Sequence, residues 1–303
     1  MDYIIGIDAG GTKTVAAAFD QHGKKIAEET GSYGNVTVHF DIGISHICDT
    51  VDRLLEKITG TCIYLCLGCA GIETGNLKEK ASSVLKKRYS FPCFFTNDAV
   101  LGLYSALQGK DGILIIAGTG SIGYLKKDGA LHRFGGWGHL INDDGSGYTI
   151  ACKAIRFIAY SFDTNAEETM LKREIFSKLG IAQMRELVDF TYRSSKGEIA
   201  ALVPVVEECA KKGDPQAQEI LRWAGERLAM LAVGLCQQYN EKQPLIAVSG
   251  SILKKIPFVQ HAFCASLNRE IGTYTLITEN FDPAKGAYYL WTDQKINKKR
   301  GNL

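Results

Sequence analysis

Two short segments of this 303-residue chain combine glycine with hydroxyl residues in a way that suits phosphate binding. In the first, Gly10 and Gly11 let the backbone approach a ligand and point its amides inward, and Thr12 adds a hydroxyl donor. Lys13 follows directly, and Asp8 lies where it could hold Mg²⁺ through water. We predict a phosphate-binding turn here, although a tight hairpin turn without a ligand would use the same glycines.

The first segment is not a Walker A loop. That motif requires a Gly-Lys-Ser/Thr order followed by a helix. Here Lys13 comes after Thr12, and residues 14–19 alternate as a strand. The phosphate would therefore bind at the bend of a hairpin.

The second phosphate-binding candidate is a run of four small residues, Gly118, Thr119, Gly120 and Ser121. Together with Gly123 it matches the pattern G-x-G-x-x-G, and an acid, Asp143, lies about 20 residues further on. A dinucleotide site of that type needs a helix after the glycines. A short strand and a turn at 127–129 follow instead, so we interpret this segment as a second phosphate-binding hairpin.

Asn97 and Asp98 lie between a predicted strand, 93–96, and a predicted helix, 99–107. The carboxyl end of a strand is where α/β folds place ligands. A carboxylate there can accept a proton from an attacking hydroxyl, which makes Asp98 the candidate general base. A helix N-cap is the alternative role for this pair.

Residues 135–147 are rich in glycine and also contain Trp137, His139 and two adjacent acids. Such a composition does not build a core, and it is typical of ligand-binding loops. We predict a binding loop that leads into a helix beginning near Gly147.

The elements that position these residues occur in a repeated order. The predicted strands fall into two groups, 3–8, 14–19 and 25–29 in the first, and 112–117, 122–126 and 131–134 in the second. The groups lie about 110 residues apart, which indicates two homologous halves with a ligand cleft between them. Residues 147–239 are predicted to be mostly helical, with a helix starting at Asp214 and Pro215.

Composition excludes several classes of protein. Lys and Arg total 35 against 33 Asp and Glu, so no global field attracts nucleic acid or an anionic membrane. The basic run at 295–300 is expected to be a solvated tail. The N-terminus lacks the basic start and long apolar stretch of a signal peptide, so we expect a cytoplasmic protein with reduced cysteines.

Three of the nine cysteines, Cys62, Cys66 and Cys69, have the spacing of a radical-SAM iron–sulfur site. Side chains alternate along a strand, so a strand over 62–68 would place Cys62 and Cys66 on one face and Cys69 on the other. Cluster ligands must converge. We therefore expect buried structural thiols.

Taken together, the two hairpins, the junction at 97–98 and the strand end at 249–251 resemble the sugar kinase/Hsp70/actin superfamily over nearly the whole chain. More narrowly, residues 135–146 resemble the N-acetylglucosamine kinases of the BadF/BadG/BcrA/BcrD group. The resemblance implies an α/β, two-lobed actin-like ATPase fold of duplicated ribonuclease H-like domains, with a helical insertion in the C-terminal lobe. The implied lobes are 1–107 plus 284–303, and 108–283.

The resemblance also implies a role for each matching position. Asp98 would be the catalytic base, Asp8 would hold Mg²⁺ through water, and the two hairpins would bind the phosphates of ATP. Gly250 and Ser251 would lie near the adenosine. The implied sugar-binding residues are Asn35, Ala70, Gly71, Asn97, Gly136, Trp137 and Asp143. A homodimer without nucleic-acid or membrane partners is the expected assembly.

The implied activity is ATP-dependent phosphorylation of a hydroxyl of an amino sugar, N-acetylglucosamine first and also N-acetylmuramic acid. Two departures leave glucosamine open: Asn142-Asp143-Asp144 replaces the usual Gly-Asp-Glu, and Ile122 occupies a position that can be Asn. A second alternative is an ATPase activator of a 2-hydroxyacyl-CoA dehydratase-type system. It would need a cysteine before the second hairpin, where 113–117 has none. A sugar-responsive repressor would need a DNA-binding region, which we do not expect.

Overall fold

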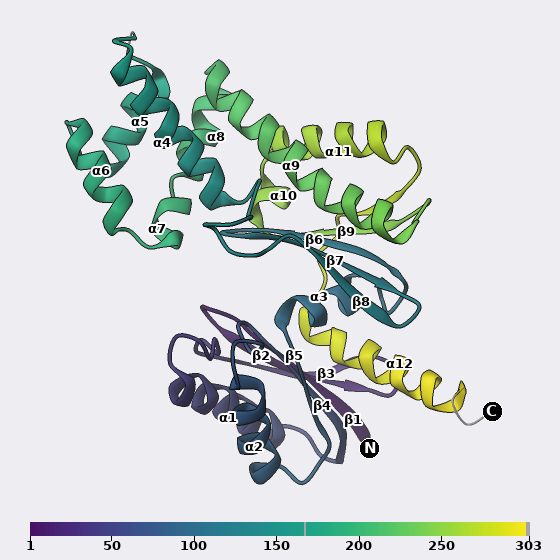
Figure 1. Cartoon of the computed structure of the whole chain (residues 1–303). Coiled ribbons are helices and arrows are strands. Elements are labelled where there is room, and N and C mark those ends of the chain that lie inside the picture. The colour runs from purple at the N-terminus through teal and green to yellow at the C-terminus, as the bar shows by residue number, and fades with distance from the viewer. Residues whose placement is uncertain (167, 301–303) are drawn as a thin grey trace. The chain divides into compact units, whose positions relative to one another are not determined.

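The computed structural model describes residues 1–166 and 168–300, except for the side chains of 297–300 (Figure 1). Most of the basic run therefore lies outside the described side chains. The chain forms two compact units. Unit 1 comprises Met1–Asp111, Lys126–Ala130 and Glu279–Leu303, and unit 2 comprises Gly112–Leu125 and Leu131–Thr278. These units differ from the expected lobes chiefly in the turn at 126–130, which groups with unit 1.

Unit 1 contains a five-stranded sheet in the order β3-β2-β1-β4-β5. Its strands are β1 (Asp2–Ala9), β2 (Thr14–Asp20), β3 (Lys25–Gly31), β4 (Thr61–Cys69) and β5 (Cys93–Thr96). β1 pairs antiparallel with β2, and β2 with β3, whereas β1, β4 and β5 run parallel. The register places Asp8 opposite Gly68 and Gly68 opposite Thr96, so the carboxyl ends of the parallel strands form one edge.

Helices cover both faces of this sheet (Figure 1). α1 (Phe40–Glu56) and α2 (Leu77–Arg88) pack on one face, where Ile47, Val51 and Leu54 of α1 form a buried stripe. α3 (Asp98–Ala106) and α12 (Gly286–Arg300) pack on the other, through Leu101 and Trp291. The short turn η1 (Pro283–Lys285) precedes α12. Because both faces are covered, β1 carries a nearly continuous apolar run.

A β-bulge in β4 overturns the predicted orientation of the cysteines. Tyr3 pairs with Cys62 and Ile4 with Tyr64, so one residue of β4 is inserted between them. The insertion reverses the alternation of side chains. Cys62 and Cys69 consequently join the α1/α2 side, and Cys66 joins the α3/α12 side, so the predicted pairing of faces was wrong. The thiols themselves are free and buried, as expected.

Unit 2 repeats the topology of unit 1, with the order β10-β9-β6-β7-β8. Its strands are β6 (Gly112–Ala117), β7 (Ser121–Lys127), β8 (Ala130–Phe134), β9 (Leu245–Ser249) and β10 (Thr275–Ile277). In each sheet the order is third, second, first, fourth and fifth strand. β6, β9 and β10 are parallel. β10 was not predicted, because three half-exposed residues carry little periodicity.

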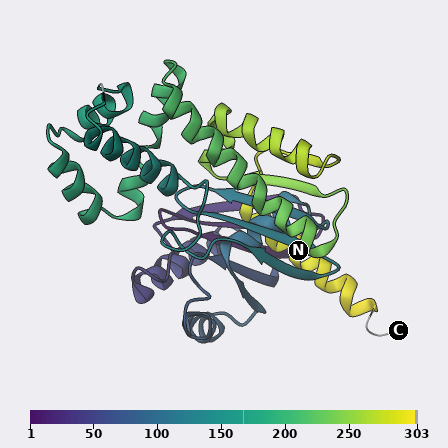
Figure 2. The same cartoon turned by 45° about the horizontal axis from the view of Figure 1, so that its top comes forward.

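The helices of unit 2 are α4 (Gly147–Asp163), α5 (Met170–Leu179), α6 (Met184–Arg193), α7 (Lys196–Ala200), α8 (Val203–Lys211), α9 (Pro215–Tyr239), α10 (Ser251–Lys255) and α11 (Pro257–Glu270). Asp214 caps α9 as predicted, since its carboxylate accepts from the Ala217 amide at 2.8 Å. α9 and α11 run side by side (Figures 1 and 2), and a Cβ at Gly225 would lie 2.3 Å from the Val259 carbonyl oxygen.

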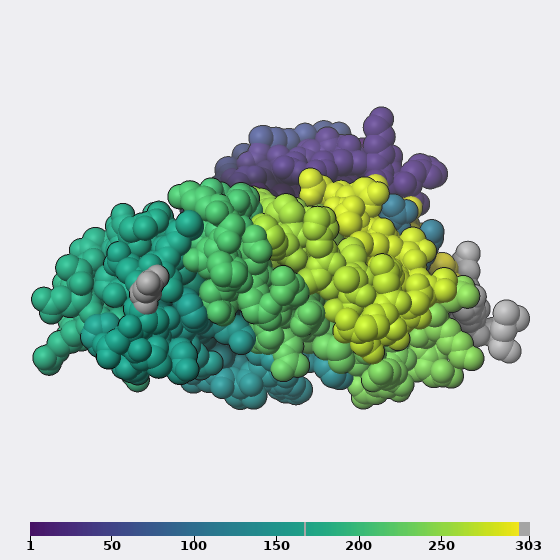
Figure 3. Space-filling model, turned by 90° about the horizontal axis from the view of Figure 1, so that it is seen from above, coloured from purple at the N-terminus to yellow at the C-terminus, as the bar shows by residue number. Residues whose placement is uncertain are grey.

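In the space-filling view, the teal helices of 147–200 form one end of unit 2, and the green helices α8 and α9 continue beside them (Figure 3). Among the described residues, no helix combines the length and apolar character that crossing a bilayer requires.

Candidate functional site

Two carboxylates meet at the carboxyl edge of the sheet in unit 1. Asp8 lies near the end of β1, and Asp98 begins α3, two residues after β5 ends. Gly68 of β4 permits this arrangement, because a Cβ there would come within 2.6 Å of the Leu101 side chain. The absence of a side chain at Gly68 thus allows the first turn of α3 to lie against the strand end.

Both carboxylates bind protons more tightly than usual. Burial raises the pKa of Asp8 to about 6, and the charges of Asp98 and Asp282 add to the effect while Lys13 opposes it. Burial also raises the pKa of Asp98, against the hydrogen bond it accepts from the Ala99 amide at 3.0 Å. A carboxylate with a raised pKa is a better proton acceptor near neutral pH.

Asn97 performs the capping role that was the alternative for the 97–98 pair. Its side-chain oxygen accepts from the Val100 amide at 2.7 Å, which satisfies one of the open amides of α3. Asp98 is the first residue of the helix and does not cap it. Because Asn97 caps the helix, the Asp98 carboxylate is not required for capping and can act in chemistry.

The residues of unit 1 suit a magnesium ion held partly by a ligand. The described residues contain no cluster of three or more His, Cys, Asp or Glu that could hold a metal unaided. Mg²⁺ usually keeps several waters and binds through one or two carboxylates plus substrate phosphates. Asp8 fits that role, because its partly buried carboxylate lies near the charges of Asp98 and Asp282, which Lys13 offsets in part.

The first phosphate-binding candidate is a tight turn, in which the Gly10 amide donates to the Lys13 carbonyl at 3.0 Å. The Gly10 carbonyl in turn accepts from the Gly34 amide at 3.0 Å. The Gly10 amide is therefore engaged within the protein, which corrects its expected role as a phosphate donor. Gly11, Thr12 and Lys13 are exposed and remain the candidates.

Three of the predicted sugar-binding residues converge at the same edge of unit 1. The Ala70 amide donates to the Ala9 carbonyl at 2.9 Å, which joins the ends of β4 and β1. Gly71 has a φ of 75°, and a Cβ there would lie 2.3 Å from Thr37. The Asn35 side-chain oxygen accepts from the Thr37 amide at 2.9 Å and from its hydroxyl at 2.6 Å. Asn35 is thereby oriented to offer N–H groups to a ligand.

The second phosphate-binding candidate belongs to unit 2 and repeats the engaged first amide. Gly118 donates to the Gly120 carbonyl at 2.9 Å, so it is corrected in the same way as Gly10. The Ser121 hydroxyl donates to the Asp144 carbonyl at 2.9 Å and is buried. The Gly118 carbonyl accepts from the Gly147 amide at 2.8 Å, which fixes the loop to the start of α4. Thr119 and Gly120 remain the candidate donors.

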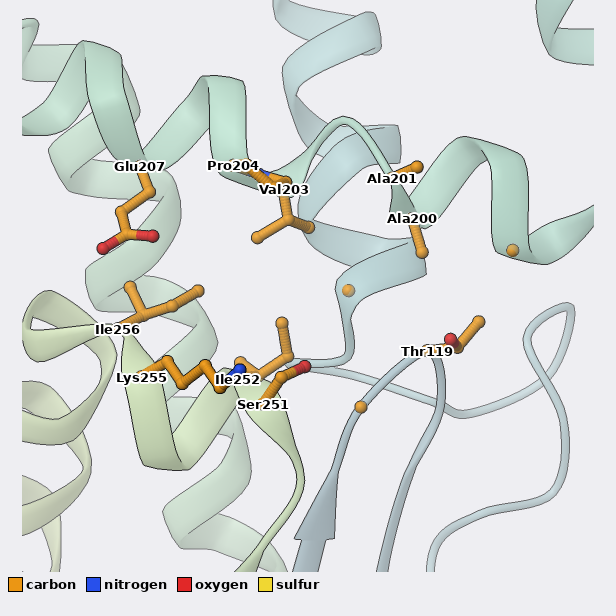
Figure 4. A pocket seen from close by; sticks show the side chains of 13 residues that line it. Thr119, Ala200, Ala201, Val203, Pro204, Glu207, Ser251, Ile252, Lys255 and Ile256 are labelled. Carbon is orange, nitrogen blue, oxygen red and sulfur yellow. The ribbon is translucent and has the colours of Figure 1, made fainter. Parts of the chain in front are cut away.

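A cavity of about 300 Å³ opens beside this loop, within unit 2. Its walls include Thr119 of the loop, Val203 and Pro204 at the start of α8, and Ser251, Ile252 and Lys255 of α10 (Figure 4). Apolar walls with a few polar groups suit a planar base and a ribose. Gly250 turns the chain from β9 into α10 with a φ of 87°, and a Cβ there would lie 2.1 Å from the Ala117 carbonyl oxygen. Ser251 therefore lines the cavity, whereas Gly250 supports it from behind.

The glycine-rich loop places its predicted sugar-binding residues in different environments. Trp137 is 62% exposed and stacks with the Arg133 guanidinium at 3.9 Å. Gly136 has a φ of 68°, and a Cβ there would meet Ile122 at 2.6 Å. Asp143 is only 4% exposed, and its carboxylate pairs with the Lys196 ammonium at 2.7 Å. Of these residues, only Trp137 is widely accessible.

Lys196 and the walls formed by Val203, Pro204 and Ile256 were missed by the sequence analysis. One local signal was available, because Ser195 and Glu198 form a capping box that marks the start of α7. That signal predicts a helix, but it does not indicate that the lysine reaches a loop 53 residues earlier in the chain.

Comparison with known proteins agrees with this architecture. The chain is 31% identical to the N-acetylmuramic acid/N-acetylglucosamine kinase of Clostridium acetobutylicum, over 95% of this chain and 97% of that protein. It is 28% identical to the N-acetyl-D-glucosamine kinase of Dictyostelium discoideum, over 97% of this chain and 99% of that protein.

Among solved structures, the putative N-acetylglucosamine kinase of Chromobacterium violaceum superposes with a TM-score of 0.76 at 21% identity, covering 95% of this chain and 98% of that one. The match confirms the actin-like sugar-kinase fold predicted from the sequence. A model of the BadF/BadG/BcrA/BcrD ATPase family matches residues 5–290. The family predicted from the sequence is also confirmed: this chain belongs to the BadF/BadG/BcrA/BcrD ATPase family.

Proposed function

We propose that this protein is an ATP-dependent kinase that phosphorylates a hydroxyl of an amino sugar, with Asp98 as the general base. The observation that carries the assignment is the state of Asp98, a partly buried carboxylate of raised pKa at the carboxyl edge of the parallel strands. Asn97 caps the helix in its place. The amino-sugar kinase class also agrees with the names of the relatives, and only the choice of sugar and the residue roles go beyond it.

The proposed reaction is an in-line phosphoryl transfer. Asp98 accepts the proton of the sugar hydroxyl as the hydroxyl oxygen bonds to the γ-phosphorus of ATP, and the bond from that phosphorus to the β–γ bridging oxygen breaks to release ADP. Mg²⁺ held through Asp8 would neutralise charge on the phosphates. The proposed phosphate donors are the amides of Gly11–Lys13 in unit 1 and those of Thr119–Gly120 in unit 2. The cavity beside Ser251 would receive the adenosine.

N-acetylglucosamine is the proposed acceptor, with N-acetylmuramic acid as a further substrate. The relatives support both, since the Clostridium protein is named for the two sugars. A relative from Vibrio cholerae, 25% identical over 84% of this chain, is named a glucosamine kinase, which keeps glucosamine as the second candidate. The Asn35 and Gly71 cluster is the proposed contact for the sugar in unit 1.

The activator ATPase receives less support from the cysteines. A shared iron–sulfur cluster needs thiolates that converge at a surface. The bulge in β4 directs Cys62 and Cys66 to opposite faces, and burial raises the pKa of each thiol to about 12.

We also propose that the kinase acts in the cytoplasm, where ATP is abundant, and as a homodimer. Sedimentation of the purified protein tests the second point.

The deciding experiment measures ADP release from MgATP with a panel of sugars: N-acetylglucosamine, N-acetylmuramic acid, glucosamine, N-acetylmannosamine and glucose. Strong turnover with an N-acetylated sugar supports the proposal and identifies the acceptor. Turnover with glucosamine alone would move the assignment to the second candidate. ATP hydrolysis that no sugar stimulates would contradict the kinase and favour the activator.

A further inference from the structure

Lys196 brings a positive charge to the second phosphate-binding loop from a helix that the sequence does not connect with it. Its ammonium lies 2.7 Å from a carboxylate oxygen of Asp143. A Cβ added to Gly120 would lie 2.8 Å from that ammonium and 2.8 Å from the same carboxylate oxygen. The backbone of the loop therefore lies next to the ion pair, at a residue where a side chain would crowd it.

The same helix borders the nucleotide cavity. Gly197 and Ala200 of α7 line it together with Gly118 and Thr119 of the loop. Lys196 therefore lies where the cavity meets the loop. With the adenosine between α8 and α10, the terminal phosphates would lie on the side of Lys196. Both neighbourhoods belong to unit 2, so this placement depends on one compact unit alone.

The backbone of Lys196 is fixed independently of its ion pair. The amide and hydroxyl of Ser195 donate to the Glu198 carboxylate at 2.7 and 2.6 Å, which closes the first turn of α7. The Lys196 side chain retains 31% of its exposure, while that of Asp143 retains 4%. The lysine can therefore meet a ligand at its open side, whereas the aspartate depends on the lysine to offset its buried charge.

An ammonium carries three donors, so it can serve a carboxylate and a phosphate together. Lysine also binds phosphate as a point charge without the planar geometry that arginine requires. Asp143 is engaged on one side by Lys196, and it belongs to the loop proposed to contact the sugar. A cation shared by the sugar loop and the phosphates would make the binding of either ligand sensitive to the other.

We propose that Lys196 binds the terminal phosphates of the nucleotide while it holds Asp143, and that it thereby couples nucleotide binding to sugar binding. The inference rests on the proposed function for the identity of the two ligands. It adds a phosphate-contacting residue and a coupling between the two substrate sites, neither of which depends on the identity of the base.

The first test measures the binding of adenosine, AMP, ADP and a non-hydrolysable ATP analogue, each with Mg²⁺, by calorimetry. Lys196→Met should weaken ADP and the ATP analogue about ten- to a hundredfold, the range for a lost charge-assisted hydrogen bond, and adenosine less than about twofold. Lys196→Arg should recover most of the loss. Lys172→Met is the matched control, because Lys172 lies on α5 of the same unit over the Phe162 and Phe176 rings.

An equal loss for adenosine and the ATP analogue would overturn the proposal, since it would mean that Lys196 only supports the fold. Unchanged binding of every nucleotide would overturn it as well. If Lys196→Met fails to fold because Asp143 is left buried and charged, the double variant with Asp143→Asn removes that charge. The double variant should fold. Compared with the wild type, it should lose much more affinity for the ATP analogue than for adenosine.

The second test measures the affinity for N-acetylglucosamine with and without the ATP analogue. In the wild type the analogue should change sugar affinity severalfold, and Lys196→Met should abolish that factor. A factor that survives in Lys196→Met would overturn the coupling. Because nucleotide discrimination is read without turnover, a protein that fails to phosphorylate any sugar could still support the phosphate contact, which separates this inference from the proposed function.

Discussion

The two sheets share one strand order but differ in the chemistry at their carboxyl edges. In unit 1 the edge gathers Asp8 and Asp98, two carboxylates whose pKa values are raised. In unit 2 the corresponding edge bears a loop of small residues, an apolar cavity and the ammonium of Lys196. A duplicated scaffold has thus kept the geometry that exposes strand ends and changed the groups displayed there.

The two candidate phosphate-binding loops, 10–13 in unit 1 and 118–121 in unit 2, also share a turn and differ in their surroundings. Each closes on the amide of its first glycine, Gly10 or Gly118. In unit 1 one hydrogen bond from Gly34 to Gly10 attaches the loop, and residues 11–13 are exposed, whereas in unit 2 hydrogen bonds from Gly147 and Tyr148 attach the loop to α4. The repeated turn is therefore a property of the scaffold, and the hydrogen bonds that attach it to the rest of the protein differ between the units. Four predictions probe this difference, beginning with the largest expected effect.

Replacing the base should show that catalysis depends on the carboxylate edge of unit 1. Asp98→Asn should lower kcat about 10²- to 10⁴-fold, because the amide cannot accept the proton, while nucleotide binding changes little. Steady-state kinetics with the best sugar measures the effect, and Asn97→Asp, which retains a capping side chain, is the comparison. Near-wild-type turnover in Asp98→Asn would show that the base lies elsewhere.

Asp8 should make the ligand-free protein less stable at neutral pH. Burial raises the pKa of Asp8 from its ordinary value of 3.8 to about 6 in the fold, so the folded state binds more protons between these values. The contribution of Asp8 to the free energy of unfolding is therefore greatest below about pH 4, falls as pH rises through this window and is lower by up to about 3 kcal/mol at pH 7. Asp8→Asn should recover much of that stability and lose activity.

Denaturant unfolding between pH 4 and 8, without nucleotide or metal, measures this effect. Asp2→Asn at the exposed start of the same strand serves as the control. An Asp8→Asn protein with the same pH profile as the wild type would refute the raised pKa.

A methyl group should distinguish the two loops. Gly120→Ala introduces a Cβ within 2.8 Å of Asp143 and Lys196, and Gly11→Ala introduces one with nothing within 4 Å. Displacing the ion pair should weaken binding of the ATP analogue about tenfold, which corresponds to about 1.4 kcal/mol. The loss from Gly11→Ala should be smaller. Equal losses in calorimetry would mean that both loops are equally crowded when the nucleotide binds.

Thiol labelling should show the smallest difference between the units. The five cysteines of unit 1 are all buried, whereas Cys152 and Cys264 of unit 2 are partly exposed. Under native conditions an alkylating reagent should modify Cys152 and Cys264 first, since burial raises the pKa of Cys62 and Cys66 to about 12. Mass spectrometry of digested samples measures the order. Early modification of Cys62 would contradict its burial.

The sequence by itself determined the elements and the family. Alternating strands, glycine turns and the repeat of about 110 residues are local patterns, and they led to the two halves, to Asp98 at a strand end and to the hairpin loops. Each depends on residues close in the chain, where periodicity and turn chemistry act directly.

Tertiary structure alone decided the remainder. The bulge in β4 changed which cysteines share a face of the sheet, because one inserted residue moves every later side chain of the strand to the opposite face. Likewise, the turns engaged the Gly10 and Gly118 amides, and only the packing of α7 on α4 brought Lys196 to Asp143 and Gly120. Contacts between distant segments depend on how whole elements pack, and no local pattern encodes that packing.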